Sequence, residues 1–96
     1  MTFTWDPEKS HANLRERGFD FEFATRVFEG ITIETEDRRR EYGERRVVAI
    51  GLVEGVHLTI VYTDRIDREG AIVRRIISAR RSNKHERQAY LEATEG

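Results

Sequence analysis

The sequence predicts an α+β fold in a single domain, residues 1–96, with two N-terminal helices, a four-stranded, mainly antiparallel sheet and a C-terminal helix. Two observations carry this prediction. Apolar residues recur at helical spacing before residue 30, whereas residues 31–80 hold four segments rich in β-branched residues, separated by short polar stretches. Strands joined by short connections pair antiparallel, and helices can then pack against their sheet.

The first helix is expected to begin after Asp6 and to end at Gly18. Aspartate caps a helix start, and Pro7 is tolerated at the first helical position because its missing N–H would be unpaired there. A second helix is expected between Asp20 and Gly30. Its apolar face holds Phe21, Ala24, Thr25 and Phe28, at positions i, i+3, i+4 and i+7.

The four expected strands span residues 31–35, 45–53, 56–63 and 71–80, with a charged loop at 36–41. Glu54-Gly55 forms a two-residue turn, a weaker version of the Asn-Gly hairpin signal. A last helix is expected from residue 82 or 83 to about residue 92, because Asn83 and Glu86 have the spacing of a capping box. Residues 94–96 are expected to be loose.

Arginines gather at the end of the fourth expected strand, where Arg74, Arg75, Arg80 and Arg81 surround a β-branched segment. The planar guanidinium fork matches two phosphate oxygens, so this pattern indicates an anion site, with nucleic acid as the first partner to consider. The alternative is a solvated strand end whose arginines form salt bridges with nearby acids, and the arginines alone do not decide between the two.

Composition excludes several classes of site. The chain has no cysteine, which rules out disulfides, thiolate chemistry and cysteine-based metal centres. No stretch approaches the ~20 apolar residues that span a bilayer, and the N-terminus lacks the basic and apolar regions of a secretory signal, so a cytoplasmic protein is expected. Residues 1–37 carry four Lys and Arg against nine Asp and Glu, and residues 38–96 carry 13 against nine, so charges of −5 and +4 leave a net −1. This balance argues against strong non-specific DNA binding.

An ordered set of short motifs resembles the BrnT family of toxins from bacterial type II toxin–antitoxin modules. The set covers nearly the whole chain and runs Trp5-Asp6-Pro7, Lys9, Asn13, Gly18, Phe21-Glu22, Ala24, Val27-Phe28, Tyr42-Gly43-Glu44, Arg46, Val61-Tyr62-Thr63, Arg65, Arg75-Ile76-Ile77-Ser78-Ala79-Arg80, Glu86 and Tyr90. The resemblance implies a RelE-like fold and RNA cleavage that stops translation. It also implies neutralisation by a BrnA-like antitoxin with a ribbon-helix-helix DNA-binding part, and repression of the operon by the complex.

One departure from this family concerns the end of the first helix. The family usually has a Lys-His pair before the glycine that ends this helix, whereas this chain has Glu16 and Arg17. The departure removes a cation and an imidazole from an edge that could lie near RNA. It slightly favours an alternative function, in which the chain is a non-catalytic binding module or an inactive toxin copy that only binds its antitoxin.

RNA cleavage without a metal needs a base, an acid and cations that stabilise the charge on the phosphorane. Arg65, Arg80 and Arg75 are the candidate catalytic residues, because an arginine stays charged and can hold two phosphate oxygens. Arg65 and Arg80 end neighbouring antiparallel strands and need not meet, whereas Arg75 or Arg74 can lie closer to Arg65. Each arginine could instead form a salt bridge, and Glu86 is a candidate partner for Arg80. The candidate RNA-binding residues are Lys9, Tyr62 and Tyr90.

No metal and no cofactor are expected. His11, His57 and His85 lie in three different expected elements and offer no close ligand pair, although His11 and His85 could transfer protons. The expected protein partner is a BrnA-like ribbon-helix-helix antitoxin, with two toxins on one antitoxin dimer. DNA binding is expected through the antitoxin alone, because this chain has no helix-turn-helix pattern.

Overall fold

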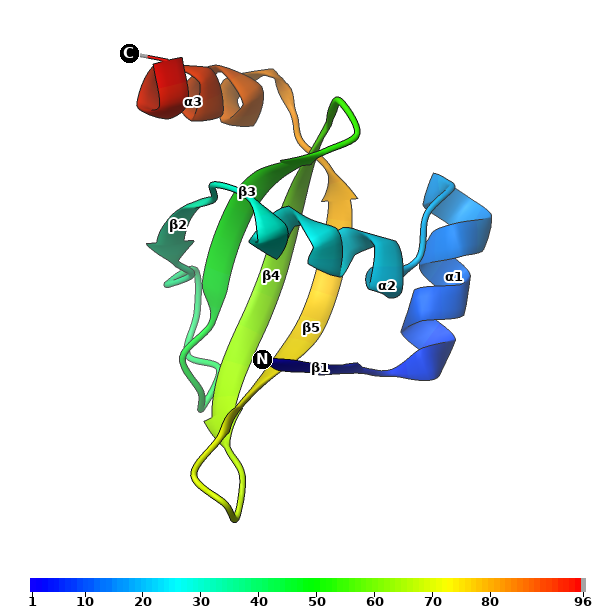
Figure 1. The fold of residues 1–96 in the computed structure, drawn as a ribbon, viewed down its shortest axis with the longest axis vertical. Helices are drawn as coiled ribbons and strands as arrows, with labels where there is room; N and C mark the ends of the chain where they lie inside the picture. The colour runs from blue at the N-terminus through cyan, green and yellow to red at the C-terminus, as the bar shows by residue number, and fades with distance from the viewer. Residues whose placement is uncertain (96) are drawn as a thin grey trace.

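The strands form one mixed sheet in the order β1-β5-β4-β3-β2 (Figure 1). The computed structural model describes residues 1–95. In chain order, its elements are β1 (Thr2–Trp5), α1 (Pro7–Arg17), α2 (Phe21–Ala24), the 3₁₀-helix η1 (Thr25–Glu29), β2 (Ile33–Glu36), β3 (Val47–Val53), β4 (Val56–Ile66), β5 (Ile72–Arg81) and α3 (Lys84–Glu95). The α+β class is confirmed, but the sheet differs in detail from the expected four antiparallel strands.

The strand β1 was not expected from the sequence. It pairs in parallel with β5, with Phe3 opposite Arg74 and Trp5 opposite Ile76, and so makes the sheet five-stranded and mixed. Only four residues take part, and their partners lie about 70 positions along the chain. Local periodicity carries no signal of such a pairing, since a short edge strand is fixed by its long-range partner.

The helix ends follow the expected capping chemistry at α1, whereas the second helix is shorter than expected. The Asp6 carboxylate accepts a hydrogen bond from the Glu8 N–H at 2.9 Å, and Gly18 ends α1 in the left-handed conformation. The expected helix between Asp20 and Gly30 divides into α2 and the tighter η1. Val27 of η1 lies directly on β3, where a Cβ on Gly51 would come within 2.7 Å of the Val27 Cβ.

The hairpins and α3 depart from the expected bounds by a few residues. Glu54 and Gly55 both have positive φ, which confirms the tight two-residue turn between β3 and β4. The strand β4 continues three residues past its expected end, and Ile66 and Ile72 form the exposed last pair before the turn of the β4–β5 hairpin. The helix α3 runs through Glu95, so residues 94 and 95 are helical rather than loose, and Gly96 lies outside the described residues.

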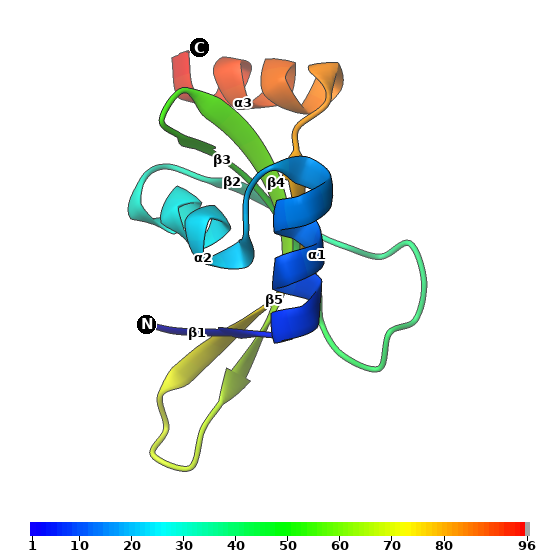
Figure 2. The same cartoon turned by 90° about the vertical axis from the view of Figure 1, so that its right-hand side faces the viewer.

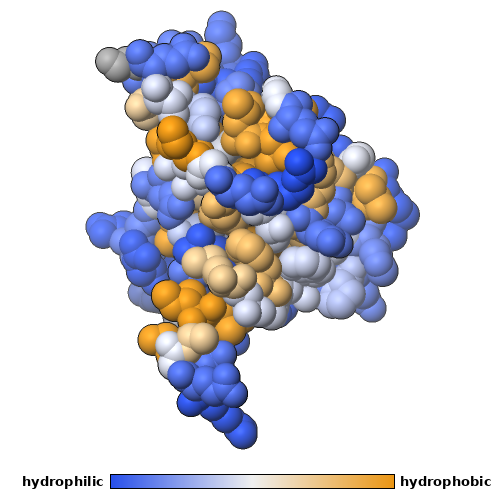
Figure 3. Space-filling model, viewed as in Figure 1, coloured by the Kyte–Doolittle hydropathy of each residue, from blue (hydrophilic) through white to orange (hydrophobic). Residues whose placement is uncertain are grey.

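The two faces of the sheet have different surroundings. The helices α2 and η1 cover one face, while α1 lies beside β5 at the edge (Figures 1 and 2). The core fills this covered face, with Ala49, Ile60 and Ala79 fully buried against it. Figure 3 shows the covered face, where apolar patches lie around α2 and just above the turn of the β4–β5 hairpin. No helix within residues 1–95 is long and apolar enough to cross a membrane.

On the opposite side of the sheet, here called the open face, no helix of the described residues packs across the middle (Figure 2). The segment between β2 and β3, residues 37–46, projects on this side, and we call it the arginine loop because five of its residues are arginines. Its base is closed by the Asp37 N–H, which donates to the Arg46 carbonyl at 2.8 Å. The open face therefore lies between α1 on one side and the arginine loop on the other.

A β-bulge decides which way the β5 arginines point. Ser78 lies opposite Val61 and Ile76 lies opposite Tyr62, so Ile77 is an extra residue in β5. In a regular strand, residues five apart point to opposite faces. Because of the bulge, Arg75 and Arg80 both lie on the open face, where their partners on β4 are Thr63 and Thr59.

Candidate functional site

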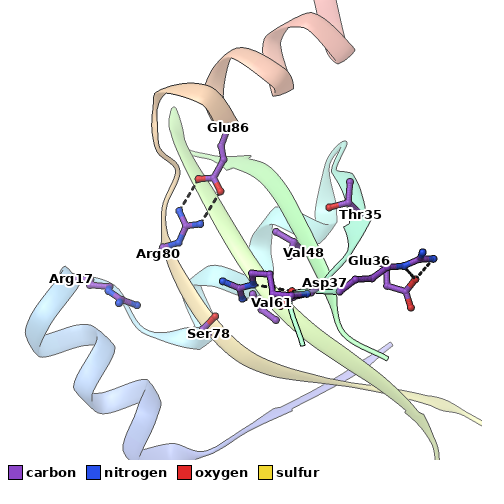
Figure 4. A pocket seen from close by; sticks show the side chains of 11 residues that line it. Arg17, Thr35, Glu36, Asp37, Val48, Val61, Ser78, Arg80 and Glu86 are labelled. Carbon is purple, nitrogen blue, oxygen red and sulfur yellow. Dashed lines mark hydrogen bonds and ion pairs between the residues drawn. The ribbon is translucent and has the colours of Figure 1, made fainter. Parts of the chain in front are cut away.

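A cavity of about 490 Å³ lies on the open face (Figure 4). Its floor is a row of one residue from each of four strands: Thr35, Val48, Val61 and Ser78, which pair successively from β2 to β5. These side chains are small, so they leave room above the sheet for a ligand. The chemistry of the cavity therefore depends on the charged side chains around its rim.

Four arginines line the cavity: Arg17 at the end of α1, Arg38 and Arg39 in the arginine loop and Arg80 near the end of β5. Arg38 forms an ion pair with the partly exposed Glu36 at 2.7 Å. Arg17 is held by its Nη1, which donates to the Asn13 Oδ1 at 3.0 Å and to the Ala79 carbonyl at 2.8 Å. Asn13 is itself buried and donates to the Phe19 carbonyl. Arg17 is one of the two residues that replace the expected Lys-His pair, and its guanidinium thus lies at the cavity.

Arg80 is oriented by Glu86 at the start of α3. Its Nη1 and Nη2 donate to the two carboxylate oxygens at 2.7 and 2.8 Å. The same carboxylate accepts from the Asn83 N–H at 2.8 Å, while the Glu86 N–H donates to the Asn83 Oδ1 at 2.9 Å, which confirms the expected capping box. The Thr59 hydroxyl also donates to Glu86 at 3.0 Å. The Arg80 hydrogen bonds, followed by those from Asn83 and Thr59, lower the pKa of Glu86 to about 2.

Arg39 is oriented by Asp37, whose side chain is only 1% exposed. The Asp37 carboxylate accepts from the Arg39 Nε and Nη2, both at 2.9 Å, from the Arg39 backbone N–H at 3.2 Å and from the Tyr42 hydroxyl at 3.2 Å. These hydrogen bonds, that of the Arg39 side chain foremost, hold the pKa of Asp37 far below its usual range despite burial. The carboxylate is therefore ionised at neutral pH and fixes the guanidinium above it.

A family model described as "Ribonuclease toxin, BrnT, of type II toxin-antitoxin system" matches residues 5–86. The chain belongs to the BrnT family. The match includes every residue that lines the cavity, from Arg17 to Glu86. No curated protein sequence matches the chain. Membership confirms the family that the sequence motifs indicated and makes this protein a BrnT-family ribonuclease toxin, with an RNA substrate and an antitoxin partner.

Two of the candidate catalytic arginines of this BrnT-family toxin lie outside the cavity. Arg65 lies six residues farther along β4 than Thr59, the partner of Arg80, which corresponds to roughly 20 Å. Its Nη2 approaches the Glu44 Oε1 at 3.4 Å. Arg75 lies opposite Thr63 on the open face, two positions along from Arg65. The structure therefore brings Arg75 close to Arg65, as the strand directions indicated, and brings neither of them to Arg80.

Lys9 lies in a groove that adjoins the cavity. The groove runs beside α1 and is lined by Lys9, Asn13 and Ile77, together with Arg17 and Ser78, which also line the cavity. Because the two hollows share these residues, they form one continuous surface across the edge of the open face. Lys9 is exposed on this surface and can meet a ligand that extends from the cavity.

The two candidate RNA-binding tyrosines are packed inside the protein. Tyr62 is 3% exposed on the covered face, its hydroxyl donates to the Glu34 carboxylate, and burial is the main cause that raises its pKa. Tyr90 is 7% exposed, and its hydroxyl donates to the Ile31 carbonyl at 2.8 Å. Neither ring lines the cavity, so these tyrosines present no free face for a base to stack on.

Among residues 1–95, no histidine lines the cavity. His57 packs edge-on against the Tyr90 ring, while His11 and His85 are exposed on α1 and α3. Within residues 1–95, no three His, Cys, Asp or Glu side chains group closely enough to hold a metal ion. The titratable acids at the cavity are the carboxylates Glu36, Asp37 and Glu86.

Sequence reasoning missed Arg39 and its anchor Asp37. They belong to a run that was interpreted as a charged loop, in which any arginine could be solvated. Asp37 gave a possible signal, because an acid two residues before an arginine can close a local ion pair. Nothing in the sequence indicated that this acid would be buried and would aim Arg39 at the end of β5.

Proposed function

We propose that this toxin is an endoribonuclease that binds an RNA phosphate in the open-face cavity and cleaves the chain without a metal ion, thereby inhibiting translation. The observation that carries this proposal is the convergence of the Arg17, Arg39 and Arg80 guanidiniums on one cavity. Arginine clusters of this kind recognise phosphate, because each guanidinium offers a planar set of N–H donors and a permanent charge.

In the proposed reaction, the 2′-oxygen of one nucleotide attacks the adjacent phosphorus and the bond to the 5′-oxygen breaks. The products are a 2′,3′-cyclic phosphate and a free 5′-hydroxyl. The arginines stabilise the negative charge that builds on the phosphorane oxygens, an effect of preorganised charge that contributes most where water is excluded. A carboxylate at the cavity accepts the proton of the 2′-hydroxyl as the new O–P bond forms, and water donates a proton to the leaving 5′-oxygen.

The RNA on either side of the cleaved bond would follow the remaining cations of the open face. Lys9 lies in the adjoining groove, and Arg75 and Arg65 continue along β5 and β4 from the other end of the face. We assign these three residues to backbone phosphates outside the cavity. Contacts of this kind position a nucleic acid and add to affinity without selecting its sequence.

Expression of this chain alone in bacteria should arrest growth and shorten bulk transcripts. The purified protein should cleave RNA in the presence of EDTA and leave 2′,3′-cyclic phosphate ends, because the proposed chemistry uses only arginines, carboxylates and water. Growth curves, RNA gels and end analysis by mass spectrometry measure these results.

A preparation of the Arg80→Ala variant, purified in parallel, controls for contaminating nucleases. Cleavage that EDTA abolishes and magnesium restores would contradict the metal-independent reaction. Normal growth with abundant folded protein would instead support the alternative, in which the chain only binds its antitoxin. One observation favours that alternative: the two Nη atoms of Arg80 already donate to Glu86.

The antitoxin is proposed to be a small BrnA-like protein with a ribbon-helix-helix domain. The two purified proteins should form a stable 2:2 complex, because ribbon-helix-helix domains are dimers and each antitoxin chain can cover one toxin. The antitoxin should supply the DNA contacts, since the net charge of the toxin is −1. Light scattering after size-exclusion chromatography measures the mass. A 1:1 complex, or operator binding by the toxin alone, would contradict this arrangement.

A further inference from the structure

We propose that Arg39 is a second catalytic arginine, which contacts the scissile phosphate from the side of the cavity opposite Arg80. This inference rests on the proposed ribonuclease function and adds a residue to it. Both side chains line the same cavity, one from the arginine loop and one from β5. They are also electrostatically close, since the charge of Arg39 acts to lower the pKa of Arg80, against the larger raising effect of Glu86.

The hydrogen bonds of Arg39 leave part of its guanidinium free for a ligand. An arginine has five N–H donors. Arg39 uses one on Nε and one on Nη2 for Asp37. Three N–H groups remain beyond these two, and one on Nη1 and one on Nη2 form the end-on edge of the fork. That edge is the one that can hold two phosphate oxygens.

Arg80 keeps a different edge free. Its Nη1 donates to Glu86 and, at 3.3 Å, to the Arg81 carbonyl, and its Nη2 donates once to Glu86. Two of the five N–H groups therefore remain, one on Nε and one on Nη2, and these form the side edge of the guanidinium. A phosphate between the two arginines could thus take bidentate contacts from both without displacing Asp37 or Glu86.

The exposure of Arg39 and Asp37 distinguishes Arg39 from a solvated loop arginine. The Asp37 side chain is buried, whereas 76% of the Arg39 side chain is exposed. The buried carboxylate therefore fixes the orientation of a guanidinium that a ligand can reach. The other arginines of the loop have different partners: Arg38 and Arg45 approach Glu36, while Arg40 and Arg46 stack on the Tyr42 ring. Among the five arginines of the loop, Arg39 alone combines a place on the cavity rim with a buried anchor, since the Glu36 partner of Arg38 is 31% exposed.

Two fixed guanidiniums suit the proposed reaction better than one. Charge develops on the non-bridging oxygens as the 2′-oxygen attacks, and donors that are already oriented need no reorganisation at that moment. Asp37 and Glu86 provide this orientation from opposite sides of the cavity. Arg39 therefore should contribute both to the affinity for RNA and to the rate of cleavage.

The test compares Arg39→Gln with Arg45→Gln in the full chain. Glutamine keeps an N–H donor for Asp37 while it removes the charge, and Arg45 is an exposed arginine of the same loop, 3.6 Å from an acid and outside the cavity. Affinity is measured by fluorescence anisotropy with a 2′-O-methyl RNA oligomer, which lacks the 2′-hydroxyl nucleophile and is not cleaved. Arg39→Gln should weaken binding about 10-fold, lower the salt slope by about one and slow cleavage of unmodified RNA about 100-fold. Arg45→Gln should stay within twofold of the unchanged protein.

The two measurements separate this inference from the proposed function. If the unchanged protein binds the oligomer but does not cleave RNA, the ribonuclease proposal fails, and the affinity of Arg39→Gln still decides whether Arg39 contacts phosphate. Arg39→Lys, which keeps the charge but lacks the fork, should recover affinity and little of the rate. Equal binding and cleavage by Arg39→Gln and Arg45→Gln, or no binding of the oligomer by the unchanged protein, would overturn the inference.

Discussion

Replacing Arg80 with alanine should lower the rate of RNA cleavage at least 100-fold while the protein remains folded. Removal of one preorganised donor from a site that stabilises developing charge typically costs 10²–10³ in rate. The fold should tolerate the change, because Glu86 keeps its hydrogen bonds from Asn83 and Thr59 and the Arg80 side chain is half exposed. The cost in stability should be about 1 kcal/mol, typical of a partly exposed ion pair. Single-turnover cleavage and thermal unfolding measure the two effects.

The conservative variant and a second arginine sharpen this test. Arg80→Lys should recover less than a tenth of the lost rate, because lysine carries the charge without the bidentate fork. Arg65→Ala should cleave within a few-fold of the unchanged protein, since Arg65 lies at the far end of β4 beside Glu44. An unfolded Arg80→Ala variant would identify Arg80 as a structural partner of Glu86. Equal losses for Arg65 and Arg80 would contradict the placement of the site at the cavity.

The elements predicted from the sequence were those with strong local signals. Asp6 and Gly18 delimit α1, Glu54 and Gly55 turn between β3 and β4, and Asn83 caps α3 with Glu86 as partner. Each of these features depends on backbone chemistry within a few residues. The strand β1 was missed for the opposite reason, because its identity depends on pairing with β5 at the other end of the chain.

The candidate site could be predicted only in part, because its geometry comes from long-range features. Arg80 was identified from its strand, and its pairing with Glu86 was foreseen as a possibility. The bulge at Ile77, which places Arg80 and Arg75 on the same face, leaves no distinct residue pattern. Tyr62 was expected to contact RNA, yet its ring is buried on the covered face, where it packs edge-on against Phe28 of η1. Only the folded structure shows which cations converge.

Changing Glu86 to glutamine should destabilise the fold and remove part of its pH dependence. At neutral pH, the variant loses the ionic part of the bidentate contact with Arg80 and weakens the capping box of α3. We expect a loss of about 2 kcal/mol, or roughly 8–15 °C in the thermal midpoint for a domain of this size. Cleavage should also slow about 10-fold, because the Arg80 guanidinium is no longer held at the cavity rim.

The sign of the pH effect follows from the pKa of Glu86, which is lowered from 4.5 to about 2 in the folded protein. A lowered pKa means that the ionised carboxylate favours the fold, so its contribution is complete above pH 5 and is lost as the pH falls toward 2. The gap in stability between the unchanged protein and Glu86→Gln should therefore be largest at pH 7 and close by about pH 2. Asp37 also titrates in acid but is present in both proteins, so its effect cancels in the difference.

The matched control for this prediction is Glu92→Gln. Glu92 lies on the same helix, is exposed and accepts a hydrogen bond only from Gln88 within the described residues. Urea unfolding followed by circular dichroism, from pH 7 to pH 2, gives the free energy of unfolding of all three proteins. Glu92→Gln should follow the unchanged protein at every pH, because the Glu92 carboxylate forms no ion pair within residues 1–95. If the free energy of unfolding of Glu86→Gln also matched that of the unchanged protein at every pH, the contact between Glu86 and Arg80 would contribute nothing to the fold. The stability of α3 would then not depend on Arg80.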